Sequence, residues 1–419
     1  MKVFTLLTIL LSAFNLFGQN VKQDLKAYLK KNQYKIESDE LIPMKEEDYN
    51  RQYFFFGFIH GARKTQEIDF QLIRSIKSRR NLRFYAPEVD FSMAYYLNKY
   101  LMTGNDSLLL SIVNLYKYAV PQDASVAFYE KIRKLKEYND QLPDHKKISI
   151  LGTDRMTSAS LFLQHIKELL PDRSLLSDPV LLKLKDFDEK TVGHYTLYAK
   201  KTDFKAFLKE NWDKLYENKS LRIVFGENYD NWNHLISQAD YFFEEKNRRE
   251  ARIFENFQKL IGFRKIEDEP VYFNFGYAHV LQAKFMNYDY LAKRFKDHYS
   301  QEKVLTVLAI MSESNVLWNT KVDKNGRYKG YGINWFGGEG DSIIERVNGI
   351  STLKRVTPMR SAAIYDLRGA DSPVDKDLYF IYTKKQLKKY RTDEITTDYI
   401  QYLIHIRNAK ANKPIQEII

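Results

Sequence analysis

The chain has 419 residues and no cysteine, which excludes disulfides, cysteine-ligated zinc sites and thiol nucleophiles. The 66 Lys and Arg residues against 54 Asp and Glu residues give a formal net charge of +12, scattered in short basic groups such as residues 77–80 and 388–391. No RNA-binding, zinc-finger or basic-arm pattern accompanies these groups, so they indicate a solvated basic surface and we expect no nucleic-acid partner.

The first residues have the order of a secretory signal peptide. Lys2 precedes an apolar run over residues 3–17, and the small and polar residues 18–20 follow it. The run is too short to span a bilayer, and no later stretch is apolar for long enough. We therefore expect a cleaved signal peptide at residues 1–19 and one soluble domain over residues 20–419, located in the periplasm or secreted, without a membrane span.

A buried strand is predicted over residues 54–59, an aromatic run that ends at His60 and Gly61. Apolar residues recur at helical spacing over residues 68–76, which predicts a helix after this strand. In open α/β sheets, ligands bind at the carboxyl ends of the strands. His60 is therefore a candidate site residue.

A second strand is predicted over residues 82–87, with Glu88 and Asp90 at its carboxyl end and a helix from about residue 92 to 102. A strand, a helix and a strand with tight connections form a βαβ unit, whose strands are parallel and whose crossover is right-handed. Parallel strands end at the same edge of a sheet. We therefore expect His60 and Glu88 to be neighbours in space.

Four further strands are expected, and two of them carry candidate site residues. The first would present Asp154 at the sheet edge, and the second would present His279. The four strands are expected at residues 147–152, 271–276, 304–311 and about 399–406.

The remaining segments predict helices and one glycine-rich hairpin. Residues 21–50 are polar and partly helical by spacing, and a long helix is expected over residues 121–139. Residues 157–262, approximately, are mostly helical by period and show no repeat. Residues 326–340 hold six of the 17 glycines, which predicts a mobile hairpin or lid. The sequence thus predicts an α/β protein with a parallel central sheet flanked by helices and a large helical insertion.

The predicted strand ends offer His60, Glu88, Asp154 and His279. Two histidines with carboxylates can bind a metal, or one histidine can act as general base on water while a carboxylate holds its tautomer. The signatures of zincin proteases, the usual serine hydrolases and P-loop proteins are absent from the sequence. A structural role also remains open, since Glu88 and Asp154 could each cap the helix that follows.

Several short segments resemble motifs of the erythromycin esterase-like family. Residues 57–61 with Arg63 resemble its GExxHG motif, and residues 87–91 resemble its strand that ends in Glu-x-Asp. These matches are collinear with the family and span most of the chain. Further matches in the family's order lie at residues 97–105, 138–139, 152–154, 249–256, 276–280 and 399–414.

The resemblance implies a hydrolase of a type distinct from the Ser-His-Asp fold, in which the motif histidine acts as base on a water that attacks an ester. His60 would be this base, Glu88 its carboxylate partner, and His279 a group that polarises the substrate or relays a proton. The resemblance further implies substrate-binding or site-ordering roles for Arg63, Asp154 and Arg249.

One position departs from the family's pattern. The glutamate of the first motif, three residues before the histidine, is Gly57 here, which weakens the transfer of macrolide-ester hydrolysis. We expect an exported hydrolase that acts on an ester-like bond of a small-molecule substrate, without a cofactor, although a divalent metal stays open. The alternatives are a non-catalytic ligand- or metal-binding protein on the same fold and an exported metal-dependent peptidase.

Overall fold

The computed structural model describes residues 24–118, 120–192, 203–242, 248–323, 327–334 and 347–419. The expected signal peptide at residues 1–19 lies outside these ranges. Parts of the predicted glycine-rich hairpin, residues 326 and 335–340, lie outside them as well. The single domain expected over residues 20–419 stays a prediction.

An eight-stranded sheet runs through the molecule in the order β1-β9-β10-β6-β2-β5-β3-β4. The six strands from β10 to β4 pair in parallel, while β9 is antiparallel to both of its neighbours. This confirms the α/β class with a parallel central sheet. The strands are β1 (Gln33–Ile36), β2 (Tyr53–Phe58), β3 (Phe84–Pro87), β4 (Ser149–Ile150), β5 (Val271–Gly276), β6 (Val304–Ser312), β9 (Ala362–Asp366) and β10 (Tyr402–Arg407).

The strands β2 and β3 are parallel, as predicted, but they are not neighbours. Strand β5 lies between them and pairs with both. The edge strand β1 and its neighbour β9 were not predicted. β1 has only four residues, of which two are exposed, so it lacks the apolar run that identified the central strands.

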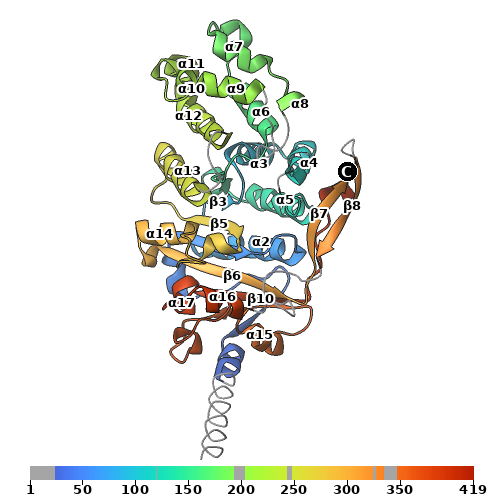
Figure 1. Cartoon of the computed structure of the whole chain (residues 1–419), viewed down its shortest axis with the longest axis vertical. Coiled ribbons are helices and arrows are strands. Elements are labelled where there is room, and N and C mark those ends of the chain that lie inside the picture. The colour runs from blue at the N-terminus through green and yellow to red at the C-terminus, as the bar shows by residue number, and fades with distance from the viewer. Residues whose placement is uncertain (1–23, 119, 193–202, 243–247, 324–326, 335–346) are drawn as a thin grey trace, which may run out of the picture.

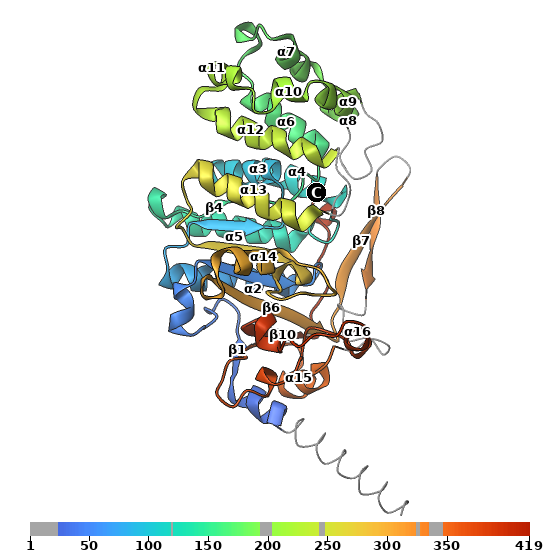
Figure 2. The same ribbon diagram turned by 60° about the vertical axis from the view of Figure 1, so that its left-hand side comes forward.

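Strand β2 is buried on both faces, which is why its sequence is aromatic almost throughout. Phe54, Phe56 and Phe58 belong to one apolar core, and Tyr53 and Phe55 belong to the other. Figures 1 and 2 show helices on both sides of the sheet. The first core is covered by α2 (Arg63–Arg79), α3 (Phe91–Thr103), α4 (Asp106–Leu115) and α5 (Val126–Asp140), and the second by α13 (Arg249–Arg264), α14 (Leu291–Tyr299) and α15 (Ile350–Val356).

A group of helices is inserted between β4 and β5, beyond the β4 edge of the sheet, at the top of Figure 1. This confirms the predicted helical insertion. The last helix of the predicted region, α13, returns to cover the sheet instead of extending away from it. The inserted helices are α6 (Ala159–Leu169), α7 (Pro179–Asp186), α8 (Glu189–Val192), α9 (Asp203–Glu210), α10 (Trp212–Leu215), α11 (Arg222–Phe225) and α12 (Tyr229–Ser237).

The glycine-rich region contributes to a separate hairpin that starts earlier than predicted. Strands β7 (Val316–Val322) and β8 (Tyr328–Asn334) pair antiparallel and extend along one side of the molecule (Figure 1). Whether this hairpin acts as a lid stays a prediction. Two short helices, α16 (Lys384–Lys389) and α17 (Thr396–Tyr399), precede β10. Among the described residues, the helices are all too short or too polar to cross a membrane.

A buried ion pair joins α2, α5 and the sheet. Lys131 Nζ lies 2.6 Å from Asp69 Oδ2, and both side chains are almost completely buried. The hydroxyls of Tyr85 and Tyr272 each donate to Asp69 at 2.7 Å, and Lys131 also donates to Tyr85 at 2.8 Å. Because the carboxylate receives three donors, its burial is compensated.

Breaking this ion pair on one side should destabilise the fold. Lys131→Met would leave the Asp69 carboxylate buried without its cation, and we expect a loss of about 3–5 kcal/mol in the free energy of unfolding. Urea unfolding followed by circular dichroism measures this loss. The control is Lys134→Met on the same helix, which replaces an exposed lysine and should change the stability by less than about 0.5 kcal/mol. Equal stability of both variants would contradict the account.

Candidate functional site

The carboxyl edge of the sheet brings together five of the six residues proposed from the sequence. His60 follows β2, Glu88 follows β3 and His279 follows β5, while Asp154 lies just beyond β4. Arg249 reaches them from the first turn of α13. We call these five residues the strand-end cluster. The sixth residue, Arg63, is not part of it.

His60 is held by carboxylates at both ring nitrogens. Its Nδ1 donates to Asp123 Oδ2 at 2.9 Å, and its Nε2 lies 3.5 Å from Glu88 Oε2. The turn after His60 depends on Gly61, whose φ of +89° favours glycine. The backbone of Leu317 leaves no room for a Cβ there, and Gly61 O accepts from Leu317 N at 2.8 Å. The His-Gly pair is therefore fixed against β7.

Glu88 belongs to the strand-end cluster and does not cap a helix. The cap of α3 is Asp90, whose carboxylate accepts from Met93 N at 2.8 Å. Glu88 Oε2 accepts from Gly276 N at 2.7 Å, and its Oε1 accepts from Arg249 Nη2 at 2.6 Å. Glu88 therefore joins β3, β5 and α13 at one point.

Arg249 links three members of the cluster. It donates to both oxygens of Asp154, from Nε at 3.0 Å and from Nη2 at 2.6 Å, in addition to Glu88. Its Nη1 lies 3.3 Å from His279 Nε2. Asp154 does not cap the next helix either, because Ser158 caps α6. The guanidinium thus compensates two buried carboxylates and orients a histidine.

His279 is oriented by a second buried carboxylate. Its Nδ1 donates to Glu250 Oε2 at 2.8 Å, and its Nε2 lies 3.7 Å from Glu88 Oε1. Glu250 also accepts from Leu291 N at 3.1 Å, which ties α13 to the start of α14. Both histidines therefore have a carboxylate at Nδ1 and an Nε2 directed toward Glu88.

Sequence reasoning missed the two carboxylates that hold these histidines. Asp123 was placed inside a helix expected over residues 121–139. The structure shows that α5 begins at Val126 after the cap residue Ser125, so Asp123 lies in the turn before it. Glu250 lies within the family-like segment 249–256, but the resemblance implies a role only for Arg249 in that segment. Neither acid follows a strand, and a position at the end of a predicted strand is the signal that identifies candidate site residues in the sequence.

Asp123 supplies His60 with a carboxylate from outside the family-like motif, whose own glutamate position is Gly57. A Cβ at Gly57 would overlap Val280 Cγ2 and Leu308 Cδ1, so the apolar core fills the space that a glutamate side chain would need. The packing of the apolar core therefore requires glycine at position 57. The His60 ring nevertheless has two acidic partners, Asp123 and Glu88.

Arg63 lies away from the cluster. It begins α2, its side chain is 60% exposed, and it forms an ion pair with Glu67 at 3.3 Å. Because the helix turns the side chain away from the sheet edge, the structure does not join Arg63 to the other five residues. It lines a groove between α2 and α5 instead. Its role in substrate binding stays a prediction.

The charges of the cluster shift the pKa values of its members in opposite directions. Burial alone would lower the pKa of His60, but the charges and hydrogen bonds of Asp123 and Glu88 outweigh it and raise this pKa well above 6.5. Burial would raise the pKa of Glu88, but His279, Arg249 and His60 hold it well below 4.5. The cluster therefore favours the ionised form of Glu88 and the protonated form of His60.

The acidic oxygens of the cluster are directed at cations of the protein itself. Arg249 takes the place between Glu88 and Asp154 that a metal would need. Within the described ranges, no group of three or more histidine and acidic side chains is arranged to hold a metal ion. The expectation that the protein works without a cofactor stays a prediction.

Gly276 lies close to both histidines and to Glu88. A Cβ at Gly276 would lie 2.9 Å from His60 Nε2, 3.4 Å from Glu88 Oε2 and 3.6 Å from His279 Cδ2. Gly276 has φ −57° and ψ 156°, which any residue can adopt. The glycine is therefore needed for space and not for backbone conformation.

No model of a known protein family matches the sequence, and no curated protein matches it. Solved structures do resemble it. A succinoglycan biosynthesis protein aligns with a TM-score of 0.65 at 17% identity, over 94% of this chain and 99% of that chain. A protein from Bacillus cereus aligns with a TM-score of 0.58 at 13% identity, over 94% of this chain and 99% of that chain.

A mutant of the erythromycin esterase EreC, in its open conformation, aligns with a TM-score of 0.57 at 10% identity, over 87% of this chain and 92% of that chain. At such identities the similarity concerns the fold, because one fold can carry several activities. The chain therefore has an erythromycin esterase-like fold, which confirms the resemblance noted from its motifs.

The carboxylate of Asp123 should control the protonation of His60. In Asp123→Asn the largest contribution that raises the pKa of His60 is removed while burial remains, so this pKa should fall. An NMR titration of the imidazole signals in the parent and the variant measures the change. An unchanged His60 titration would show that Asp123 does not set its charge.

Proposed function

We propose that the protein is an exported hydrolase that uses His60 as general base to direct water at an ester-like bond of a small molecule. The observation that supports this most is the paired arrangement of the two histidines. Each has a carboxylate at Nδ1 and an Nε2 atom within 3.7 Å of a Glu88 oxygen, and both rings lie close to Gly276. Export rests on the signal-like order of residues 1–19.

Asp123 gives His60 the tautomer that a general base needs. Because the carboxylate accepts a hydrogen bond from Nδ1–H, the proton of the neutral ring stays on Nδ1 and the lone pair lies on Nε2. In the proposed step, Nε2 takes a proton from water while the water oxygen bonds to the acyl carbon. The carbonyl electron pair moves onto its oxygen, then re-forms the double bond and expels the alcohol oxygen. That oxygen takes the proton back from Nε2.

The other members of the cluster position His60 and balance charge. Glu88 lies 3.5 Å from His60 Nε2 and stabilises the imidazolium that forms when the ring accepts a proton. Arg249 directs its donors at Glu88, Asp154 and His279, so it orders the site. In this proposal His279, oriented by Glu250, polarises the substrate or relays a proton.

The substrate of this hydrolase is proposed only by class. The erythromycin esterase of the comparison acts on erythromycin, as its name says, but here the apolar residues Val280 and Leu308 occupy the place of the motif glutamate. A generic ester therefore fits the chain better than a macrolide lactone.

A second candidate is a binding protein that uses the same site without turnover. It is favoured by the pKa of His60, which Asp123 and Glu88 raise against the effect of burial, because a protonated ring cannot act as a base. This candidate predicts ligand affinity with no hydrolysis, and the metal-dependent peptidase predicts activity that chelators abolish.

The deciding experiment is the hydrolysis of a panel of chromogenic esters by the purified chain, with and without a chelator. In His60→Ala we expect turnover to fall by a factor on the order of 100–10,000, because the general base is lost. The matched control is His145→Ala, an exposed histidine distant from the cluster in sequence, which should keep the parent rate.

Each outcome of the ester panel separates the candidates. Turnover that is lost in His60→Ala and insensitive to chelator supports the metal-free hydrolase. Loss of turnover in chelator moves the function to a metal-dependent enzyme. If no ester is cleaved, or if His60→Ala is as active as the parent, the proposed base is wrong and ligand binding becomes the function to test.

Gly276 can be replaced without disturbing the backbone, because its φ and ψ suit any residue. Gly276→Ala places a methyl group 2.9 Å from His60 Nε2, so the ring must move and turnover should drop by about 100-fold with the fold intact. The control is Gly262→Ala, an exposed helix position whose Cβ would touch nothing within 4 Å. This control should keep full activity and gain about 0.4–1 kcal/mol of stability. Full activity of Gly276→Ala would place the reaction elsewhere.

A further inference from the structure

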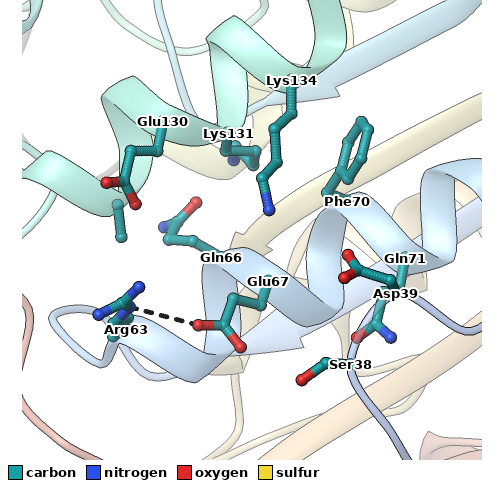
Figure 3. Close-up of a pocket in the computed structure, with 11 residues that line it drawn as sticks. Ser38, Asp39, Arg63, Gln66, Glu67, Phe70, Gln71, Glu130, Lys131 and Lys134 are labelled. Carbon is teal, nitrogen blue, oxygen red and sulfur yellow. Dashed lines mark ion pairs between the residues drawn. The ribbon is translucent and has the colours of Figure 1, made fainter. Parts of the chain in front are cut away.

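A polar groove between α2 and α5 lies apart from the strand-end cluster (Figure 3). Its volume is about 180 Å³. Pockets that bind drug-sized molecules have volumes of ~300–1,000 Å³, so this groove suits a smaller ligand. Three basic and three acidic side chains line it, together with two glutamines and the ring of Phe70. The charges therefore balance, and the groove does not select for a simple anion or cation. The charged residues are Asp39, Arg63, Glu67, Glu130, Lys131 and Lys134.

Two buried amide oxygens in this groove have no hydrogen-bond partner within the described residues. Gln66 and Gln71 are each 4% exposed, and the Oε1 atom of each is unpaired. The orientation of Gln71 is fixed, because its Nε2 donates to the carbonyl oxygens of Glu37 and Glu40. A buried unpaired acceptor costs free energy, which a ligand with N–H donors would recover.

Two opposite charges on α5 also face the groove without partners among the described residues. Glu130 and Lys134 stand at an i,i+4 spacing that commonly forms an ion pair, yet no described residue pairs with either of them. In the view of Figure 3 the two side chains diverge, and the amide of Gln66 lies between them. Of the other lining charges, Lys131 binds Asp69 and Arg63 binds Glu67, and Asp39 belongs to the segment before α2.

We propose that this groove binds a free amino acid. The ammonium group would donate to Glu130 and to Gln66 Oε1, and the carboxylate would bind Lys134. An apolar side chain would lie against Phe70 and Ala127, which line the same groove. One molecule with both charges thereby satisfies the two unpaired side chains and a buried oxygen, which a simple amine or a simple acid does only in part.

The groove is a different place from the proposed active site. None of the five residues of the strand-end cluster lines it, and only Gln66 also borders the small cavity beside Glu88 and Asp123. Amino-acid binding can therefore be measured without any substrate. Failure of this proposal would leave the proposed hydrolase untouched.

The test is isothermal titration calorimetry of the full chain with l-leucine, l-alanine and l-phenylalanine. Leucinamide, which lacks the carboxylate, and N-acetyl-l-leucine, which lacks the ammonium group, should each bind about tenfold more weakly than l-leucine or worse. Glucose serves as the neutral polar probe and should not bind.

Variants assign the binding to the groove. Glu130→Gln and Lys134→Met should each weaken l-leucine binding by about tenfold, because each removes one charge from an exposed side chain. The matched control Glu137→Gln changes an exposed glutamate two turns further along α5 and should bind like the parent. Circular dichroism checks that each variant is folded.

Several results would overturn the proposal. These are no binding of any of the three amino acids, equal affinity for leucinamide and l-leucine, or equal loss of affinity in Glu137→Gln and Glu130→Gln. Binding of glucose in place of the amino acids would assign the groove to neutral polyols instead.

Discussion

The guanidinium of Arg249 lies between Glu88 and Asp154 and contacts His279, so one cation compensates the two carboxylates that follow β3 and β4. Burial would lower the pKa of Arg249, but Asp154 and Glu88 raise it well above its usual value, so its charge is permanent. Removing one partner of a buried pair typically costs about 3–5 kcal/mol. The arrangement of both histidines depends on this charge, since Glu88 is their common neighbour.

The parallel sheet explains why these residues meet at all. Strands β2, β5 and β3 are adjacent and run in the same direction, so His60, His279 and Glu88 leave the sheet at one edge. Helix α13 then adds Arg249 and Glu250 from its first turn, and the turn before α5 adds Asp123. The end of strand β3 thus supplies Glu88, the shared neighbour of both histidines. A turn and a helix start supply Asp123 and Glu250, the carboxylates that orient the two rings. Ligands of such sheets commonly bind at this edge.

Much of this site followed from sequence, because an apolar run identifies a buried strand and the residue after it identifies the edge. His60, Glu88 and His279 were found in this way. Asp123 and Glu250 were not, because they precede or begin helices and no period marks them. Arg63 was assigned by motif position alone, and the start of α2 turned it outward. The strand order, with β5 between β2 and β3, depends on contacts between residues that are far apart in the sequence. The hydrophobic periodicity of a segment gives no information about such contacts.

The central claim is that His60 acts as the base and that Asp123 sets its pKa, and the pH dependence of kcat/KM for a cleaved ester tests it most directly. Burial is outweighed by Asp123 and Glu88, so the pKa of His60 is raised and the neutral base forms only as the pH rises above 6.5. The account predicts a rate that increases through this range and an increase that occurs at lower pH in Asp123→Asn. Superimposable profiles, or a rate already at its maximum below pH 6.5, would contradict it.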